Sequence, residues 1–175
     1  MNASYLHASY LLSSLVDTQT WGRALGAHLV AGDVIALIGD LGAGKTTLTQ
    51  ALACGMGIIE PVTSPTFALA QEYPGRLPLF HFDPYRLDSP EAFADIGFEE
   101  YFKRGGVMVV EWADKIDMLL PTERLTLTLS EESASEDGGD AARLVNADAV
   151  GERYVGLLTD LNTQPDIASL LRFSE

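Results

Sequence analysis

A glycine-rich segment from Gly39 to Thr46 carries the residue types that bind phosphate. Its sequence, Gly-Asp-Leu-Gly-Ala-Gly-Lys-Thr, fits a glycine, any four residues and then Gly-Lys-Thr or Gly-Lys-Ser. Glycines let the backbone curl until its N–H groups point at phosphate oxygens, and a following helix adds its positive N-terminal end. In this pattern Lys45 reaches the β- and γ-phosphates and the Thr46 hydroxyl ligates Mg²⁺. The segment therefore predicts a P-loop, the phosphate site of a nucleoside triphosphate.

Two acidic residues are candidates to complete a metal site beside this loop. Asp83 follows the strand candidate at 79–82, and Glu111 follows the apolar run at 107–110. Because ligands of open α/β sheets bind at the carboxyl ends of strands, both acids are well placed. Either could hold Mg²⁺ through water, and Glu111 could also orient or deprotonate an attacking water. We therefore expect Thr46, Asp83 and Glu111 as metal ligands, against the alternative that both acids are ordinary polar ends of strands.

Three further features have both a functional and an ordinary interpretation. The segment Thr63-Ser64-Pro65-Thr66 is a turn by composition, but its hydroxyls could contact the γ-phosphate or metal and reorder on hydrolysis. Trp112 could stack on a base or ribose, although a Trp at the end of a strand more often packs in the core or at its rim. His81 is interpreted as a strand histidine with satisfied hydrogen bonds, and not as a catalytic base.

The phosphate loop needs a strand before it and a helix after it, and the sequence predicts both. Residues 34–38 form a continuous apolar run between turn residues, typical of a strand buried on both faces of a sheet. Residues 45–54 fit a helix. Upstream, apolar residues recur every four positions from 21 to 29 and predict a helix capped by Ser14 or Asp17.

Downstream of the loop the sequence predicts two hairpins with a helix and a strand between them. Residues 67–73 and 78–82 are strand candidates joined by a Pro-Gly turn. A helical region begins at Ser89-Pro90 and runs to residue 102 with a break near Gly97, and 107–110 is a second apolar strand.

The C-terminal third predicts a second hairpin and a final helix. Its strands are expected at 124–129 and 142–145, joined by the acidic segment 131–140, which is either a solvated connection or a partner-binding loop. A short helix is expected at 152–161. The elements together predict an α/β P-loop fold, a central mixed sheet flanked by helices with C-terminal hairpin strands. We expect a single domain over residues 1–175, with mobile ends at about 1–4 and 165–175.

The charge balance argues against a surface that grips nucleic acid directly. The net charge is −14, from 25 acidic and 11 basic residues. A nucleic-acid-binding protein needs a surface that neutralises phosphates, which this balance makes hard to assemble. If the function involves RNA, we expect a partner to supply that contact. The simpler alternative is that the charge keeps the protein in solution.

Composition also bears on where the protein works. No apolar run approaches the roughly 18 to 20 residues of a membrane-spanning helix, and the apolar N-terminal stretch lacks the basic flank of a signal peptide. The single cysteine, Cys54, allows no intrachain disulfide. We therefore expect a cytoplasmic protein with no membrane partner.

Four motifs, in this order, resemble the bacterial TsaE (YjeE) family. They are Gly-Asp-Leu-Gly-Ala-Gly-Lys-Thr-Thr at 39–47, Thr-Ser-Pro-Thr-Phe at 63–67, His-Phe-Asp-Pro-Tyr-Arg-Leu at 81–87 and Glu-Trp at 111–112. The resemblance spans roughly Asp17 to Leu129. The sequence departs from the family pattern at Pro84, which should rigidify its turn, and at Ala113-Asp114, where Pro-Glu or a similar pair often follows the Trp. The change at Pro84 removes no functional group, and neither departure changes the resemblance to the family.

The resemblance implies a weak ATPase that uses ATP and Mg²⁺. The family works with the proteins TsaB and TsaD, and TsaD transfers threonylcarbamoyl to adenosine 37 of tRNAs reading ANN codons, so tRNA contact would be indirect. By matching motif, the catalytic residues are expected to be Lys45, Asp83 and Glu111, and 63–66 a switch-like loop. The expected nucleotide contacts are Asp40, Leu41, Gly42, Ala43, Gly44, Lys45, Thr46, Thr47, Thr66 and Trp112. How the base is held stays open, with the segment near Thr18 a candidate.

Three alternatives to a simple ATPase remain open. A GTPase is one, because Asp114-Lys115-Ile116-Asp117 differs by one residue from the guanine-reading pattern Asn-Lys-x-Asp. A small-molecule kinase is another, although the arginines are scattered and form no Arg-rich lid. In the third, nucleotide occupancy serves mainly as an assembly switch, and hydrolysis resets a complex.

Overall fold

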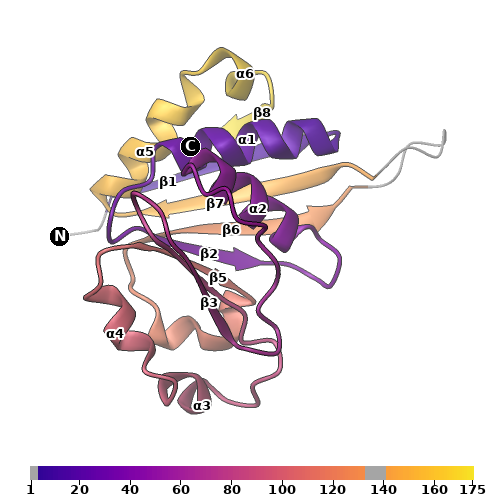
Figure 1. The fold of residues 1–175 in the computed structure, drawn as a ribbon. Coiled ribbons are helices and arrows are strands. Elements are labelled where there is room, and N and C mark those ends of the chain that lie inside the picture. Colours follow the sequence, from indigo (N-terminus) through magenta and orange to yellow (C-terminus); the bar gives the residue numbers. More distant parts are fainter. Residues whose placement is uncertain (1–3, 133–140) are drawn as a thin grey trace.

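The computed structural model describes residues 4–132 and 141–175 (Figure 1). In these residues eight strands form one mixed sheet with the order β3-β4-β5-β2-β6-β7-β1-β8. The strands are β1 Tyr5–Leu12, β2 Val34–Ile38, β3 Ala70–Tyr73, β4 Leu79–Phe82, β5 Val107–Glu111, β6 Arg124–Glu131, β7 Arg143–Val150 and β8 Leu171–Ser174. The helices are α1 Leu15–Ala27, α2 Lys45–Gly55, α3 Pro90–Ala94, α4 Phe98–Phe102, the 3₁₀ segment η1 Ala113–Leu119, α5 Glu152–Asn162 and α6 Pro165–Ala168.

The centre of the sheet is parallel and buried. β2 lies between β5 and β6 and is parallel to both, and β4 is parallel to β5. All of β5 is buried, and so are the first four residues of β2, as their continuous apolar sequences predict. Because β2, β4 and β5 are parallel, their carboxyl ends meet at one edge of the sheet.

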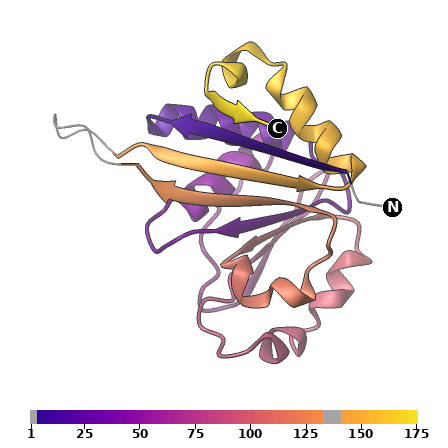
Figure 2. The same ribbon diagram turned by 180° about the vertical axis from the view of Figure 1, so that it is seen from behind.

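Helices cover both faces of the sheet, and each face is covered by a different set of helices (Figures 1 and 2). One face packs against α1, α2 and α5 through a core that includes Trp21, Leu48 and Leu157. The opposite face, over β2, β4 and β5, packs against α3, α4 and η1 around a group of aromatic rings that includes Phe82 and Phe93. Each residue on a central strand therefore faces one of two cores, in alternation.

The described part of the chain confirms both predicted hairpins. β3 and β4 pair antiparallel, as do β6 and β7. β3 begins at Ala70 and not at residue 67, and β6 and β7 end at Glu131 and Val150, later than the predicted 129 and 145. The acidic segment predicted as a loop falls mostly on 133–140, outside the described residues. The break near Gly97 is also confirmed, because it separates α3 from α4 with a left-handed backbone at Gly97.

Four elements were not predicted from the sequence, namely β1, η1, α6 and β8. In β1 the side chains of Ala8, Tyr10 and Leu12 are buried while their neighbours are less so, the alternation of a half-buried strand. Residues 165–175, where a mobile end is expected, contain α6 and the strand β8, which pairs with β1. Ile167 anchors this end in the core and is 1% exposed. Of the other expected mobile end, residues 1–3 lie outside the described residues.

Helices α1 and α2 approach each other very closely. Ser14 caps α1 by accepting a hydrogen bond from the Asp17 backbone N–H at 3.1 Å. Further along α1, a methyl group at Gly26 would lie 2.0 Å from the carbonyl oxygen of Leu52 in α2. Glycine here lets the two helices touch, and α2 is the helix that follows the glycine-rich loop.

Candidate functional site

The glycine-rich loop connects β2 to α2, the position that the sequence predicts. Gly44 has φ 102° and is the residue before the first turn of α2, a left-handed conformation that favours glycine. At Gly39 a side chain would lie 2.5 Å from the carbonyl oxygen of Leu129, so the loop passes too close to β6 for any larger residue. The loop is therefore shaped by residues that lack side chains.

Lys45 is buried at the first position of α2, with 5% of its surface exposed. Its Nζ donates hydrogen bonds to the carbonyl oxygens of Gly39 at 2.6 Å and Asp40 at 2.9 Å. The same Nζ lies 3.7 Å from the centre of the Trp112 ring. Burial lowers the pKa of Lys45, and the nearby negative charge of Glu111 acts in the opposite direction. The ammonium is thus held at the loop between backbone dipoles and an aromatic face.

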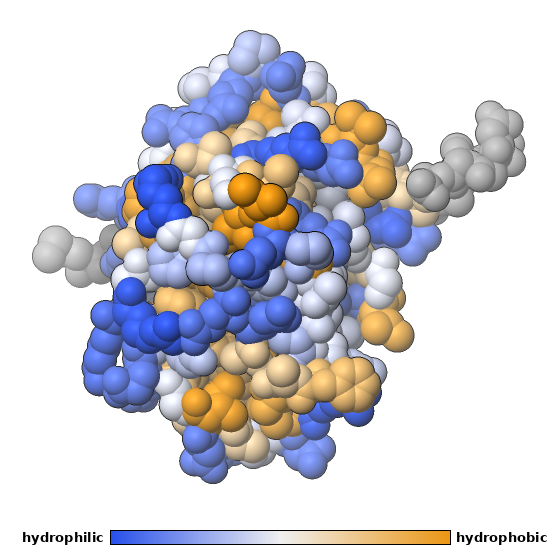
Figure 3. Space-filling view, in the orientation of Figure 1, coloured by the Kyte–Doolittle hydropathy of each residue, from blue (hydrophilic) through white to orange (hydrophobic). Residues whose placement is uncertain are grey.

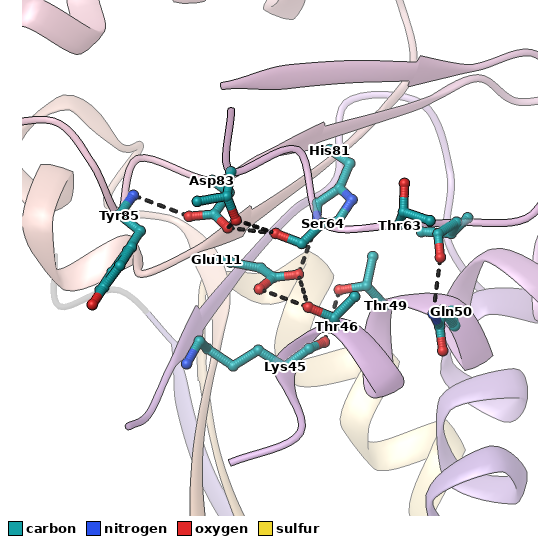
Figure 4. Close-up of polar contacts among 12 residues, drawn as sticks. Lys45, Thr46, Thr49, Gln50, Thr63, Ser64, His81, Asp83, Tyr85 and Glu111 are labelled. Carbon is teal, nitrogen blue, oxygen red and sulfur yellow. Dashed lines mark hydrogen bonds and ion pairs between the residues drawn. The ribbon is translucent and has the colours of Figure 1, made fainter. Parts of the chain in front are cut away.

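Glu111 joins the loop to the neighbouring strands (Figure 4). The Thr46 hydroxyl lies 2.9 Å from Oε1 and 3.1 Å from Oε2 of Glu111 and donates to this carboxylate. His81 Nε2 lies 2.9 Å from Oε1 of the same residue. Glu111 is 3% exposed, so these donors replace the water that a carboxylate would otherwise bind. Two of the three expected metal ligands, Thr46 and Glu111, are therefore in contact.

Asp83, the third expected metal ligand, holds the 63–66 segment in place. Its Oδ2 accepts hydrogen bonds from Ser64 at 2.6 Å and Thr66 at 2.8 Å. Its Oδ1 accepts from the Tyr85 backbone N–H at 3.0 Å, across Pro84. The hydroxyls that the sequence assigns to a switch-like loop thus bind the second carboxylate of the site.

The expected catalytic and metal residues face one pocket of 360 Å³ at the carboxyl edge of the sheet. Its lining residues are Leu41, Gly42, Gly44, Lys45, Thr46, Thr47, Ser64, Thr66, Asp83, Tyr85, Glu111 and Trp112. Of the expected nucleotide contacts, Ala43 and Asp40 are not among them. Ala43 lines an adjacent pocket, and the Asp40 side chain is exposed while its carbonyl oxygen accepts from Lys45.

The adjacent pocket, of 330 Å³, lies on the other side of the loop. It shares Gly42, Gly44 and Thr47 with the first pocket and is also lined by Thr18 of α1. Arg143 enters it from β7 and donates from Nε to the carbonyl oxygen of Ala43 at 3.1 Å. The two pockets therefore meet along the glycine-rich loop.

Three residues of the site have no role in it assigned from the sequence, namely His81, Tyr85 and Arg143. His81 had an available signal, because a residue two positions before Asp83 on a strand points to the same face. Tyr85, whose ring packs at a tilt against Trp112 with ring centres 4.7 Å apart, lay within a motif but was assigned no contact. Arg143 had no local signal, since only the pairing of β6 and β7 carries it to the loop.

Residues 114–117, which resemble the guanine-reading pattern, contact other parts of the protein. Asp117 forms an ion pair with Arg124 at the start of β6. Lys115 donates to the carbonyl oxygen of Tyr85 at 2.6 Å. Neither charged side chain lines either of the two pockets beside the loop.

A family model described as threonylcarbamoyl adenosine biosynthesis protein TsaE matches residues 12–139. The chain belongs to the TsaE family. Among TsaE relatives, the protein of Bacillus subtilis is 41% identical over 87% of this chain and 92% of its own length. That of Treponema pallidum is 47% identical over 66% of this chain and 86% of its own length. Both relatives are described as tRNA threonylcarbamoyladenosine biosynthesis proteins.

A solved TsaE-family structure confirms the α/β fold. The crystal structure of YdiB from Bacillus subtilis superposes with a TM-score of 0.75 at 36% identity, and covers 93% of this chain and 97% of its own. The family match spans the glycine-rich loop, Asp83 and Glu111. Within the described residues no helix has the length and apolar character needed to cross a membrane.

Proposed function

We propose that this TsaE-family chain binds Mg-ATP and hydrolyses it slowly, in support of the complex that forms N6-threonylcarbamoyladenosine at position 37 of tRNAs reading ANN codons. The observation that carries the proposal is the pocket at the carboxyl edge of the sheet. There a lysine, a hydroxyl and two carboxylates converge from three segments of the chain, namely Lys45 and Thr46 at the start of α2, Asp83 after β4 and Glu111 at the end of β5.

The side chains in this pocket fit a magnesium–phosphate group. Mg²⁺ prefers oxygen ligands and is usually held by one or two carboxylates together with substrate phosphates and water. Thr46, Asp83 and Glu111 offer only oxygen atoms. The N-terminal end of α2 and the glycine-shaped loop provide the N–H groups and partial positive charge that favour phosphate. The donor set therefore suits hard-cation and phosphate chemistry.

The adjacent pocket supports a place for the base and ribose. It is continuous with the phosphate loop through Gly42 and Gly44, and its wall includes Thr18, Leu12 and Leu129. A volume of 330 Å³ lies at the lower end of the range of small-molecule pockets. In this arrangement the triphosphate would lie along the loop, with the base beside α1.

Each residue of the first pocket has a role in the proposed hydrolysis. Lys45 would leave the carbonyl oxygens of Gly39 and Asp40 and donate to the β- and γ-phosphates. Glu111 would orient the attacking water and accept its proton. Bound Mg²⁺ would neutralise charge on the phosphate oxygens.

Asp83 would connect nucleotide occupancy to the 63–66 segment. Any contact that competes for Asp83 would release the hydroxyls of Ser64 and Thr66, which now bind it. This network also supports the role of an assembly switch, which the ATPase proposal includes.

We propose that TsaB and TsaD are the partners and that they, rather than this chain, contact tRNA. The net charge of −14 supports this division, because a tRNA-binding surface must neutralise phosphates. The proposal places the reaction in the cytoplasm. GTP is disfavoured as the nucleotide because Asp117 is paired with Arg124 outside both pockets.

Nucleotide binding and turnover of the purified chain test the proposal. Titration calorimetry with Mg²⁺ should show saturable binding of ATP and much weaker binding of GTP. Lys45→Ala should weaken ATP binding, while Glu111→Gln should retain binding and lose phosphate release in the presence of TsaB and TsaD. Equal affinity for ATP and GTP, or unchanged turnover by Glu111→Gln, would contradict it.

A further inference from the structure

His81 is a fully buried titratable residue that the proposed mechanism does not use. It lies on β4 with 0% of its surface exposed. The parallel pairing of β4 and β5 places His81 opposite Val109, and Glu111 is two residues further along β5. Since alternate residues of a strand share a face, His81 and Glu111 point toward the same face as Leu79 and Val109, which share a core with Leu48 of α2.

In the hydrogen bond between His81 and Glu111, His81 is the donor and Glu111 the acceptor. Nε2 lies 2.9 Å from Oε1, which can only accept when the carboxylate is ionised. An imidazole with its hydrogen on Nε2 donates this bond. The other ring nitrogen, Nδ1, is buried without a hydrogen-bond partner in residues 4–132 and 141–175. If the hydrogen were on Nδ1 instead, that N–H would be buried without a partner. Nε2 and Oε1 would then both be acceptors and would repel each other.

The bond acts on one oxygen of the carboxylate. His81 binds Oε1, and it is absent from the lining of the 360 Å³ pocket, where Glu111 is present. Thr46 also lies nearest to Oε1 and slightly further from Oε2, at 2.9 and 3.1 Å. Two donors converging on Oε1 leave Oε2 with the greater freedom to meet a ligand in the pocket.

We propose that His81 is a positioning residue that holds the Glu111 carboxylate in the orientation needed to direct the attacking water. The inference rests on the proposed ATP hydrolysis and adds a residue to it. His81 acts through Glu111 and touches neither nucleotide nor metal. Residues behind the first layer of such sites fix the orientation of the residues in front, and their loss typically costs 10- to 100-fold in activity or metal affinity.

Three substitutions of His81 separate positioning from simple packing. His81→Gln keeps an N–H donor three bonds from Cβ, the same number as Nε2 of histidine. His81→Asn has its donor one bond shorter and does not reach Glu111. His81→Leu fills the space without a donor. If the hydrogen bond to Glu111 is needed, the kcat of each variant depends on whether its side chain places an N–H donor within reach of Glu111. It does not depend on whether the side chain is merely polar.

The test measures ATP affinity by calorimetry and kcat for phosphate release with saturating TsaB and TsaD. His81→Leu and His81→Asn should retain wild-type affinity while kcat falls about 10- to 100-fold. His81→Gln should recover most of the lost kcat. Thermal unfolding checks each variant, and the comparison of the two polar variants stands even if His81→Leu does not fold.

A double substitution, and Glu111→Gln alone as the control variant, complete the experiment. His81→Asn should add little to the defect of Glu111→Gln, because both changes act on one carboxylate. Wild-type kcat in both His81→Leu and His81→Asn, with Glu111→Gln inactive, would overturn the positioning role alone. If wild-type protein and Glu111→Gln hydrolyse ATP equally, the proposed hydrolysis itself fails, and the role of His81 fails with it.

Discussion

At the scale of single residues, the site contains buried carboxylates, and each of them accepts hydrogen bonds from neighbouring groups. Glu111 accepts from Thr46, and His81 lies within hydrogen-bond distance of it. Asp83 accepts from two hydroxyls and a backbone N–H. A buried carboxylate without such donors would be strongly unfavourable. The cost of burying these acids is thus offset by groups that a ligand must replace or reorganise when it binds.

Trp112 provides a spectroscopic test of how Lys45 moves. Its ring centre lies 3.7 Å from Lys45 Nζ, whereas the other tryptophan, Trp21, is fully buried in the core. If Mg-ATP draws the lysine onto phosphate, the environment of the Trp112 ring changes. We expect a saturable fluorescence change in a Trp21→Phe variant, with a midpoint equal to the Kd from calorimetry. Tight binding with no change in that variant would show that Lys45 stays on the ring.

The main residues of the site could be predicted because each lies in a local pattern. Lys45 and Thr46 belong to a contiguous motif, and Asp83 and Glu111 follow recognisable strands. The local patterns did not specify contacts between distant segments. Arg143 reaches the loop from 100 positions away, and His81 acquires its partner only when β4 pairs with β5.

At the scale of elements, the position of α2 depends on how closely α1 can approach it. Three glycines make the contact: a methyl group would lie 2.6 Å from Ala51 at Gly22, 2.0 Å from Leu52 at Gly26 and 2.2 Å from Arg23 at Gly55. In two of the three cases the neighbouring atom is backbone oxygen, which cannot rotate away. α2 carries Lys45 and Thr46 in its first turn, so this interface also sets the position of the loop.

Gly26→Ala should destabilise the protein and impair the site. Overpacking of this kind costs about 1–3 kcal/mol or more, because backbone atoms must move. Urea unfolding should show the loss, and ATP affinity should fall as α2 shifts. Gly156→Ala in α5 is the matched control, since a methyl group there meets nothing within 4 Å. Equal stability of the two variants would contradict the proposed close contact.

Elements with strong periodicity could be predicted, and those defined by pairing could not. The two apolar strands, α1, α2, α5 and both hairpins follow from the sequence. β8 has only four residues, and its pairing with β1 is a long-range contact that no local pattern encodes. η1 follows Trp112, which has a positive φ of 53°, a conformation that a residue other than glycine rarely adopts and that the sequence does not announce.

At the scale of the whole molecule, one sheet lies at the centre, and different helices cover its two faces. The pocket opens at the carboxyl ends of the parallel strands, as expected for ligand sites of α/β sheets. On the face seen in Figure 3, hydrophilic side chains predominate and hydrophobic ones form small separate groups.

Hydrogen bonds and an ion pair connect helix α5 to the start of β2 and contribute to global stability. The Val34 backbone N–H donates to the Tyr154 hydroxyl oxygen at 2.8 Å. Next to it, Arg153 binds both carboxylate oxygens of Asp33 at 3.0 and 2.7 Å. Burial raises the pKa of Tyr154 to about 12, so the folded state favours the protonated phenol.

Tyr154→Phe should lower the free energy of unfolding by about 1–3 kcal/mol at pH 8, since it leaves the Val34 N–H unpaired. The folded-state pKa exceeds the usual value of 10.0, so the tyrosine contributes fully below pH 10, and this contribution is lost as pH rises toward 12. The stability gap between wild type and variant, from urea unfolding, should therefore be constant from pH 7 to 9 and narrow above pH 10. A gap that stays constant or widens to pH 11 would contradict the raised pKa.

Mass spectrometry of tRNA nucleosides is the most direct test of whether ATP turnover at this pocket supports threonylcarbamoyladenosine formation, as proposed above. Cells that naturally produce the chain are depleted of it and supplied with wild-type protein or with Glu111→Gln at equal expression. Depletion should lower threonylcarbamoyladenosine, wild type should restore it, and Glu111→Gln should not. An unchanged level of the nucleoside on depletion, or full restoration by Glu111→Gln, would contradict the account.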